Sequence, residues 1–78
     1  MDPALISDHL AAAEGHVAEG LAHLNHQRSI IAELERDGHD ATLARELLAT
    51  LEETQAMHIV NRDQLAEELR LAKEMTRR

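Results

Sequence analysis

The sequence predicts an all-α fold, an antiparallel hairpin of two long helices. Apolar residues recur at steps of three and four over two stretches of roughly 35 residues each, which is the spacing of one helix face. The short segment Asp37-Gly38-His39-Asp40 separates these stretches. Neither stretch alternates with the period of two that is typical of a strand.

The first helix is predicted over about residues 3–37. Asp2 is a favoured N-cap residue, and Pro3 suits the first helical position because its missing N–H costs nothing there. Gly38 is suited to the left-handed conformation that ends many helices. The apolar stripe of this helix consists of Ile6, Leu10, Ala13, Val17, Gly20, Leu24, Gln27, Ile31 and Leu34.

The second helix is predicted over about residues 41–76, after a turn at 37–40 and with Asp40 as its cap. Its expected stripe is Leu43, Leu47, Leu51, Thr54, His58, Asn61, Leu65, Leu69 and Ala72. A short turn forces the two helices antiparallel, so residues 1–78 form a single hairpin. Pairing about the turn places Gly20 opposite His58.

The composition predicts a hairpin that associates with another chain. The 78 residues include no Phe, Tyr, Trp or Cys, so the core is a thin layer of aliphatic side chains. Further apolar side chains lie beside the two stripes and would be left in water by a lone hairpin. We therefore expect a homodimeric four-helix bundle, with another helical protein as the alternative partner. The expected interface is formed by Leu5, Leu21, Ile30, Leu48, Met57, Ile59 and Leu71.

Charge and hydropathy exclude two classes of partner. The net charge is −7, from 15 acidic and 8 basic residues, and this balance repels the phosphates of nucleic acids. No apolar run approaches the ~18 residues of a membrane span, and the first residues lack the basic start of a secretory signal. We expect no nucleic acid, no membrane contact and a cytoplasmic location.

A histidine stripe is the first candidate site. His16, Glu19, His23 and His26 follow one narrow face of the first helix, and imidazole and carboxylate are ordinary ligands of zinc. A metal-responsive or pH-responsive bundle is therefore the alternative function. Packing of the rings against a second chain explains the same spacing, and no motif of a bundle metal site is present. We expect no cofactor.

A polar layer in the middle of the hairpin is the second candidate. It comprises Gly20, Thr54, His58 and Asn61, where a missing Cβ gives room for an imidazole and a polar layer sets the register of the helices. A histidine on a helical hairpin also suggests phosphotransfer as a third function. However, His58 is not followed by the acidic residue and proline of phosphoacceptor domains, so we expect no enzymatic activity.

The turn region resembles a group of short bacterial helical-hairpin proteins. The similar residues are the run from Ile31 to Asp40, which contains Leu-Glu-Arg-Asp-Gly-His-Asp, the segments 44–48 and 53–58, and the upstream segment 16–20. The resemblance covers about residues 16–65. It implies a cytoplasmic helical protein of bacterial origin and brings no established activity with it.

Overall fold

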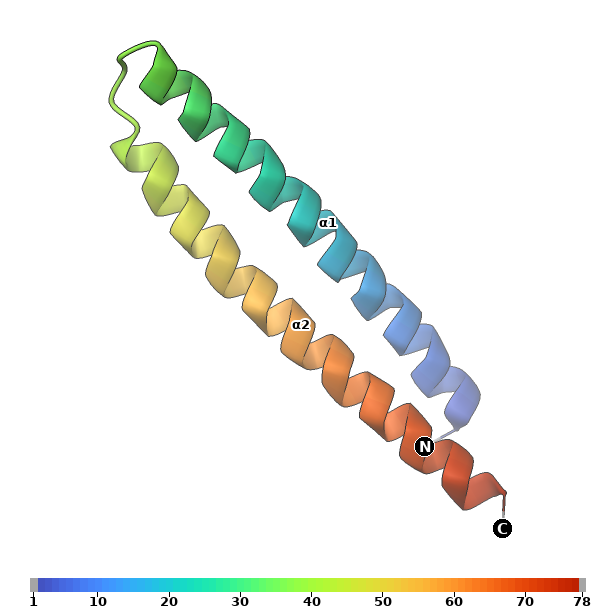
Figure 1. Cartoon of the computed structure of the whole chain (residues 1–78). Helices are drawn as coiled ribbons and strands as arrows, with labels where there is room; N and C mark the ends of the chain where they lie inside the picture. The colour runs from blue at the N-terminus through green and yellow to red at the C-terminus, as the bar shows by residue number, and fades with distance from the viewer. Residues whose placement is uncertain (1, 78) are drawn as a thin grey trace.

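Two helices packed side by side make up the structure, a computed structural model that describes residues 2–77. Met1 and Arg78, which belong to the predicted hairpin of residues 1–78, lie outside the described residues. Helix α1 (Pro3–Arg36) and helix α2 (Thr42–Thr76) run antiparallel and pack against each other (Figure 1). The molecule is a rod of 63 × 14 × 13 Å, only two helices thick. The predicted two-helix hairpin is therefore present.

The start of α1 follows the sequence prediction. Asp2 has an extended backbone conformation, and its carboxylate Oδ1 accepts a hydrogen bond from the Ala4 backbone N–H at 3.0 Å. Pro3 occupies the first helical position. Asp2 thus satisfies one of the backbone donors that the first turn of a helix leaves free.

The end of α1 is a left-handed turn at Gly38. The backbone N–H of His39 donates to the Leu34 carbonyl at 2.8 Å, and the N–H of Gly38 donates to the Glu35 carbonyl at 3.2 Å. Gly38 has a φ of 74°, which only glycine adopts without steric cost. These two bonds form a Schellman motif, which satisfies carbonyl groups at the helix end.

The predicted stripe of α1 is the face that packs against α2. We call the surface along which the two helices meet the seam. All nine predicted α1 positions are buried or half-buried, and the most enclosed are Ile6, Ala13, Leu24 and Gln27. Ala13 and Gly20 are small, so the helix backbones can approach closely at these positions.

The predicted stripe of α2 is wrong at four positions. Leu43 and Leu47 are 80% and 49% exposed, and Thr54 and Asn61 are also exposed. The α2 side of the seam is instead a regular series of buried and half-buried positions, namely Ala41, Ala44, Leu48, Leu51, Gln55, His58, Arg62, Leu65, Leu69 and Ala72.

The error arises from two consecutive steps of four between Leu43 and Leu51. Eight residues turn about 80° past two full turns of an α-helix, so this path crosses from one face of α2 to another. The observed seam alternates steps of three and four from Ala41 onward. The prediction that Leu48 lies on an outer flank is wrong for the same reason, because Leu48 is half-buried in this series.

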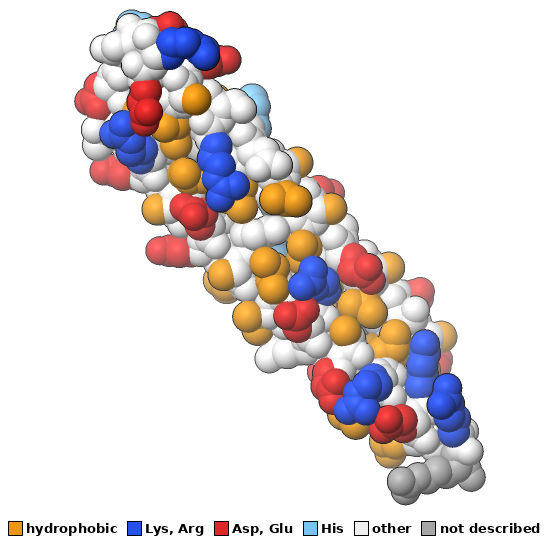
Figure 2. All heavy atoms as spheres, in the orientation of Figure 1, with side chains coloured by type: hydrophobic (Ala, Val, Ile, Leu, Met, Phe, Trp, Pro, Cys, Tyr) orange, Lys and Arg blue, Asp and Glu red, His pale blue; other side chains and the backbone are white. Residues whose placement is uncertain are grey.

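Much of the apolar surface remains exposed. Within residues 2–77, nine large aliphatic side chains are at least 36% exposed, whereas only two, Ile6 and Leu24, are buried. Apolar side chains appear among charged ones along the visible face of the rod (Figure 2). Over the described residues, neither helix has a stretch long and apolar enough to cross a membrane.

Candidate functional site

A small cavity lies between the two helices near the middle of the rod. Its volume is about 80 Å³. Four of its lining residues come from each helix, and they include three histidines and one carboxylate. The lining residues are His16, Glu19, Gly20, His23, Leu51, Thr54, Gln55 and His58.

Three of the four residues of the histidine stripe line this cavity. His16, Glu19 and His23 line it together with His58 of α2, whereas His26, the fourth candidate ligand, does not. His26 is exposed. No group of three or more His, Cys, Asp or Glu side chains in residues 2–77 is arranged to hold a metal ion.

The closest approach of two histidines is across the seam. The ring centroids of His16 and His58 are 5.6 Å apart, and the ring planes are inclined by 38°. Among the residues that the structure describes, the side-chain bonds that join the helices come from Gln27, Gln55 and the Arg45–Glu35 pair, and neither imidazole takes part in them. Both rings therefore keep nitrogen atoms available for a ligand.

Gln55 takes the position opposite Gly20 that was predicted for His58. The Gln55 Nε2 atom donates to the Val17 carbonyl at 2.9 Å, which fixes the side chain against α1. The amide oxygen then occupies the space above Gly20, where an added Cβ would lie 1.8 Å from Oε1. Gly20 is thus required by the Gln55 side chain.

The predicted polar layer is correct in part. Gly20 and His58 are half-buried, but the assignment of Thr54 and Asn61 to this layer is wrong, because both are exposed. Their positions lie one residue before Gln55 and Arg62, which occupy the seam. The polar group enclosed at this level is the Gln55 amide, which is only 7% exposed.

One atom of the polar layer has no partner. The Gln55 Oε1 atom is buried and accepts no hydrogen bond. The second buried glutamine, Gln27, makes the equivalent bond, from its Nε2 to the Ala44 carbonyl at 2.8 Å, but it has no buried side-chain atom without a partner. The sequence analysis did not place Gln55 in the seam, because glutamine is usually found on the surface of a protein. The available signal was its spacing from Leu51 and His58, which continues the alternation of four and three.

The acidic turn caps α2 from just outside the helix. The N-cap position is Ala41, which makes no side-chain cap bond, so the prediction of Asp40 at this position is one residue off. The Asp40 carboxylate Oδ1 accepts from the Thr42 hydroxyl at 2.6 Å and from the Thr42 backbone N–H at 2.9 Å. These bonds hold the pKa of Asp40 below its usual value, with the hydroxyl bond the larger cause. Asp40 thereby satisfies a free donor at the start of α2.

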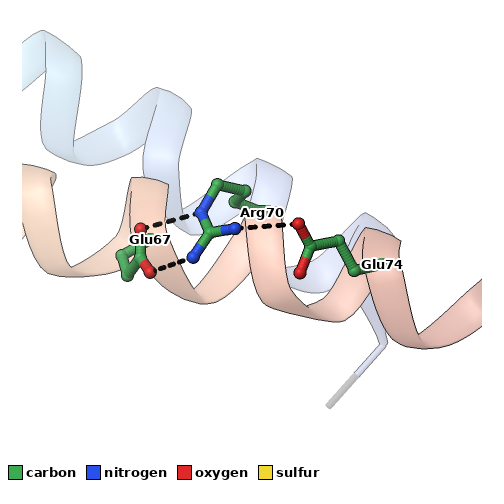
Figure 3. Close-up of polar contacts among 3 residues, drawn as sticks. All are labelled: Glu67, Arg70 and Glu74. Carbon is green, nitrogen blue, oxygen red and sulfur yellow. Dashed lines mark hydrogen bonds and ion pairs between the residues drawn. The ribbon is translucent and has the colours of Figure 1, made fainter.

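The acidic pair Glu67-Glu68 lies on the outer surface of α2. Arg70 donates to Glu67 and, at 2.8 Å, to Glu74 (Figure 3). The hydrogen bond from Arg70 lowers the pKa of Glu67, and the same bond raises the pKa of Arg70. All three side chains are more than half exposed. This network is a set of surface ion pairs, which are typically worth little in water.

Comparison with protein-family models, with curated proteins and with solved structures finds no match for this chain. The resemblance to short bacterial hairpin proteins thus stays a prediction. Any function has to be argued from the geometry of the hairpin itself.

Proposed function

We propose that the protein is a non-catalytic interaction module that acts by self-association, as a homodimeric four-helix bundle. The observation that carries this proposal is the exposed apolar surface. Of the large aliphatic side chains that the structure describes, nine are exposed, nine are half-buried and only two are buried. Exposed apolar patches are typical of association sites, and five of the nine exposed side chains lie along one side of α2.

A second stripe on α2 supplies the association surface. We call it the outer stripe, and it runs along the helix at steps of three and four beside the seam. Every one of its members is exposed, namely Leu43, Leu47, Thr50, Thr54, Met57, Asn61, Gln64, Glu68, Leu71 and Met75. Two shallow hollows lie on it, one formed around Met57 and Val60, and the other around Leu71 and Met75.

The outer stripe is complementary to itself. Leu43 and Met75 each lie 16 residues from position 59, and Leu47 and Leu71 each lie 12 residues from it. A two-fold axis at position 59, the midpoint of α2, therefore places apolar residues of one copy on apolar residues of the other. Thr54 meets Gln64, five residues from the axis, and Thr50 meets Glu68, nine residues from it, whereas Met57 meets Asn61, two residues from it.

Of the predicted interface, two residues belong to the outer stripe, Met57 and Leu71. Leu5, Leu21 and Ile59 are exposed on other faces, where a bundle could cover them. Ile30 is half-buried on α1. The proposed dimer brings the two α2 helices into antiparallel contact, and α1 of each copy flanks them.

Sedimentation equilibrium tests the proposal. The wild type should have twice the mass of the 8.7 kDa chain. Leu47→Glu should be monomeric, because it places a charge in the apolar contact, whereas Ala49→Glu, on an exposed face away from the outer stripe, should remain dimeric. A wild type that is monomeric throughout the micromolar range would contradict the proposal.

Disulfide trapping tests the register, since the chain has no cysteine of its own. An oxidised mixture of Leu47→Cys and Leu71→Cys should give a covalent heterodimer. Neither variant alone should cross-link, because two copies of position 47 lie 24 residues, or roughly 36 Å, apart along antiparallel helices. Cross-linking of Leu47→Cys with itself would indicate a parallel arrangement instead.

A further inference from the structure

We propose that His16 and His58 form a site for a divalent transition-metal ion such as Zn²⁺ across the two helices. The two residues are 42 positions apart in the sequence, and only the fold brings them together. Their ring centroids lie 5.6 Å apart on the wall of the central cavity.

The separation of the rings fits two ligands of one ion. Zinc binds imidazole nitrogen at about 2.0–2.1 Å, and two imidazoles in a tetrahedral site have ring centroids roughly 5 Å apart. The observed separation of 5.6 Å is close to this value. His16 and His58 both lie far from the ends of their helices, so regular helical backbone supports each side chain.

The cavity supplies room and suitable surroundings. A volume of about 80 Å³ exceeds the roughly 30 Å³ share of one water molecule, so an ion with bound water can enter. The Glu19 carboxylate on the wall adds negative charge. Because no three His or acidic side chains converge among the described residues, the protein supplies two ligands and water completes the coordination.

The chemistry of the ligands selects the metal class. Imidazole favours zinc, copper and nickel, whereas calcium and magnesium prefer oxygen ligands. Thiolate is excluded as a ligand, since the chain has no cysteine. An ion held by α1 and α2 together binds only the folded hairpin, so it must raise the stability of the fold.

Titration with zinc chloride after treatment with a chelator tests this site. Calorimetry should show one ion per hairpin, and saturating zinc should raise the melting temperature by about 5 °C. His16→Ala and His58→Ala should each weaken zinc binding about tenfold or more. The matched controls His9→Ala and His26→Ala remove exposed histidines of α1 that do not line the cavity, and they should bind zinc as the wild type does.

Two further measurements distinguish a loss of zinc binding from a loss of folding or of self-association. Imidazole ¹⁵N spectra of the wild type should show zinc-dependent shifts at both His16 and His58. Leu47→Glu, which should be monomeric, should bind zinc with unchanged affinity. Zinc affinity that is unchanged in His58→Ala, or that falls equally in His26→Ala, would overturn the cross-helix site.

Discussion

Gly15 and Gly20 lie five residues apart in α1, yet their surroundings predict opposite effects of the same substitution. A Cβ on Gly15 would meet nothing within 4 Å, so Gly15→Ala should gain about 1 kcal/mol from helix propensity alone. A Cβ on Gly20 would overlap the Gln55 amide. Gly20→Ala should therefore displace Gln55, break its bond to Val17 and cost about 1–2 kcal/mol. Urea denaturation measures both.

The Gln55→Ala background provides the control for this contact. Truncation of Gln55 empties the space above Gly20, so Gly20→Ala should become stabilising there, by about 1 kcal/mol as at Gly15. If Gly20→Ala stabilises the unmodified protein as much as Gly15→Ala does, then Gln55 does not pack on Gly20.

The unpartnered oxygen of Gln55 makes a second prediction at the residue scale. A buried acceptor without a donor costs about 1–3 kcal/mol. Gln55→Met keeps an unbranched chain of similar length and removes this atom together with the Nε2 bond to the Val17 carbonyl. Because the unpartnered acceptor costs more than one such bond contributes, the change should raise the unfolding free energy by about 1 kcal/mol. The same change at Gln27 loses the corresponding Nε2 bond to Ala44 and relieves no buried unpartnered atom, so it should give no gain. Equal effects at the two positions in thermal unfolding would contradict this account.

At the scale of the elements, the sequence predicted α1 better than α2. In α1 the seam carries the larger apolar residues, such as Ile6 and Leu24, so hydrophobic periodicity identifies the correct face. In α2 the seam begins with Ala41 and Ala44, while Leu43 and Leu47 lie outside it. Hydrophobicity alone favours the leucines. Close packing favours the alanines, because small residues let Gln27 reach the Ala44 carbonyl.

The candidate site was accessible to sequence reasoning only in part. The heptad spacing of His16 and His23 is visible in the sequence, and so is the glycine at position 20. The approach of His16 to His58 depends on the register of the two helices. The predicted register placed His58 opposite Gly20, whereas Gln55 lies there in the structure. The difference arose because Gln55 was not recognised as a seam residue.

The cap of α2 predicts how the hairpin responds to acid. Because the folded-state pKa of Asp40 is lowered, its contribution to stability is complete above the unfolded value of about 3.8 and is lost as the pH falls through the folded value. Asp40→Asn can still cap the helix but does not titrate. The urea midpoint of this variant should therefore fall less than that of the wild type between about pH 5 and pH 2.

The control for the cap is Asp63→Asn. Asp63 is an exposed carboxylate in the middle of α2, and its only described partner is the adjacent Arg62. Its neutralisation should leave the acid dependence close to that of the wild type. An Asp40→Asn variant with the full wild-type response to acid would show that the cap bond does not distinguish the two protonation states.

At the scale of the whole molecule, the rod shape explains why association is expected. A body 63 Å long and two helices thick has no interior beyond the seam, and the most enclosed apolar residues are Ile6, Ala13, Leu24 and Ala41. Each helix can bury one stripe in a hairpin. The outer stripe of α2 exposes five further large apolar side chains, which only another chain can cover.

This shape predicts that thermal stability depends on protein concentration. If folding and dimerisation are coupled, each tenfold increase in concentration stabilises the folded state by about 1.4 kcal/mol of dimer. For two chains of this length, that corresponds to a rise in melting temperature of about 4 °C per decade. Circular dichroism at 222 nm over two decades of concentration measures this rise.

The control is Leu47→Glu, which should melt at the same temperature at every concentration, and at a lower temperature than the wild type. A wild-type melting temperature that does not change with concentration would mean that the hairpin is stable without covering its outer stripe, because mass action requires the dependence whenever the unfolding unit is a dimer.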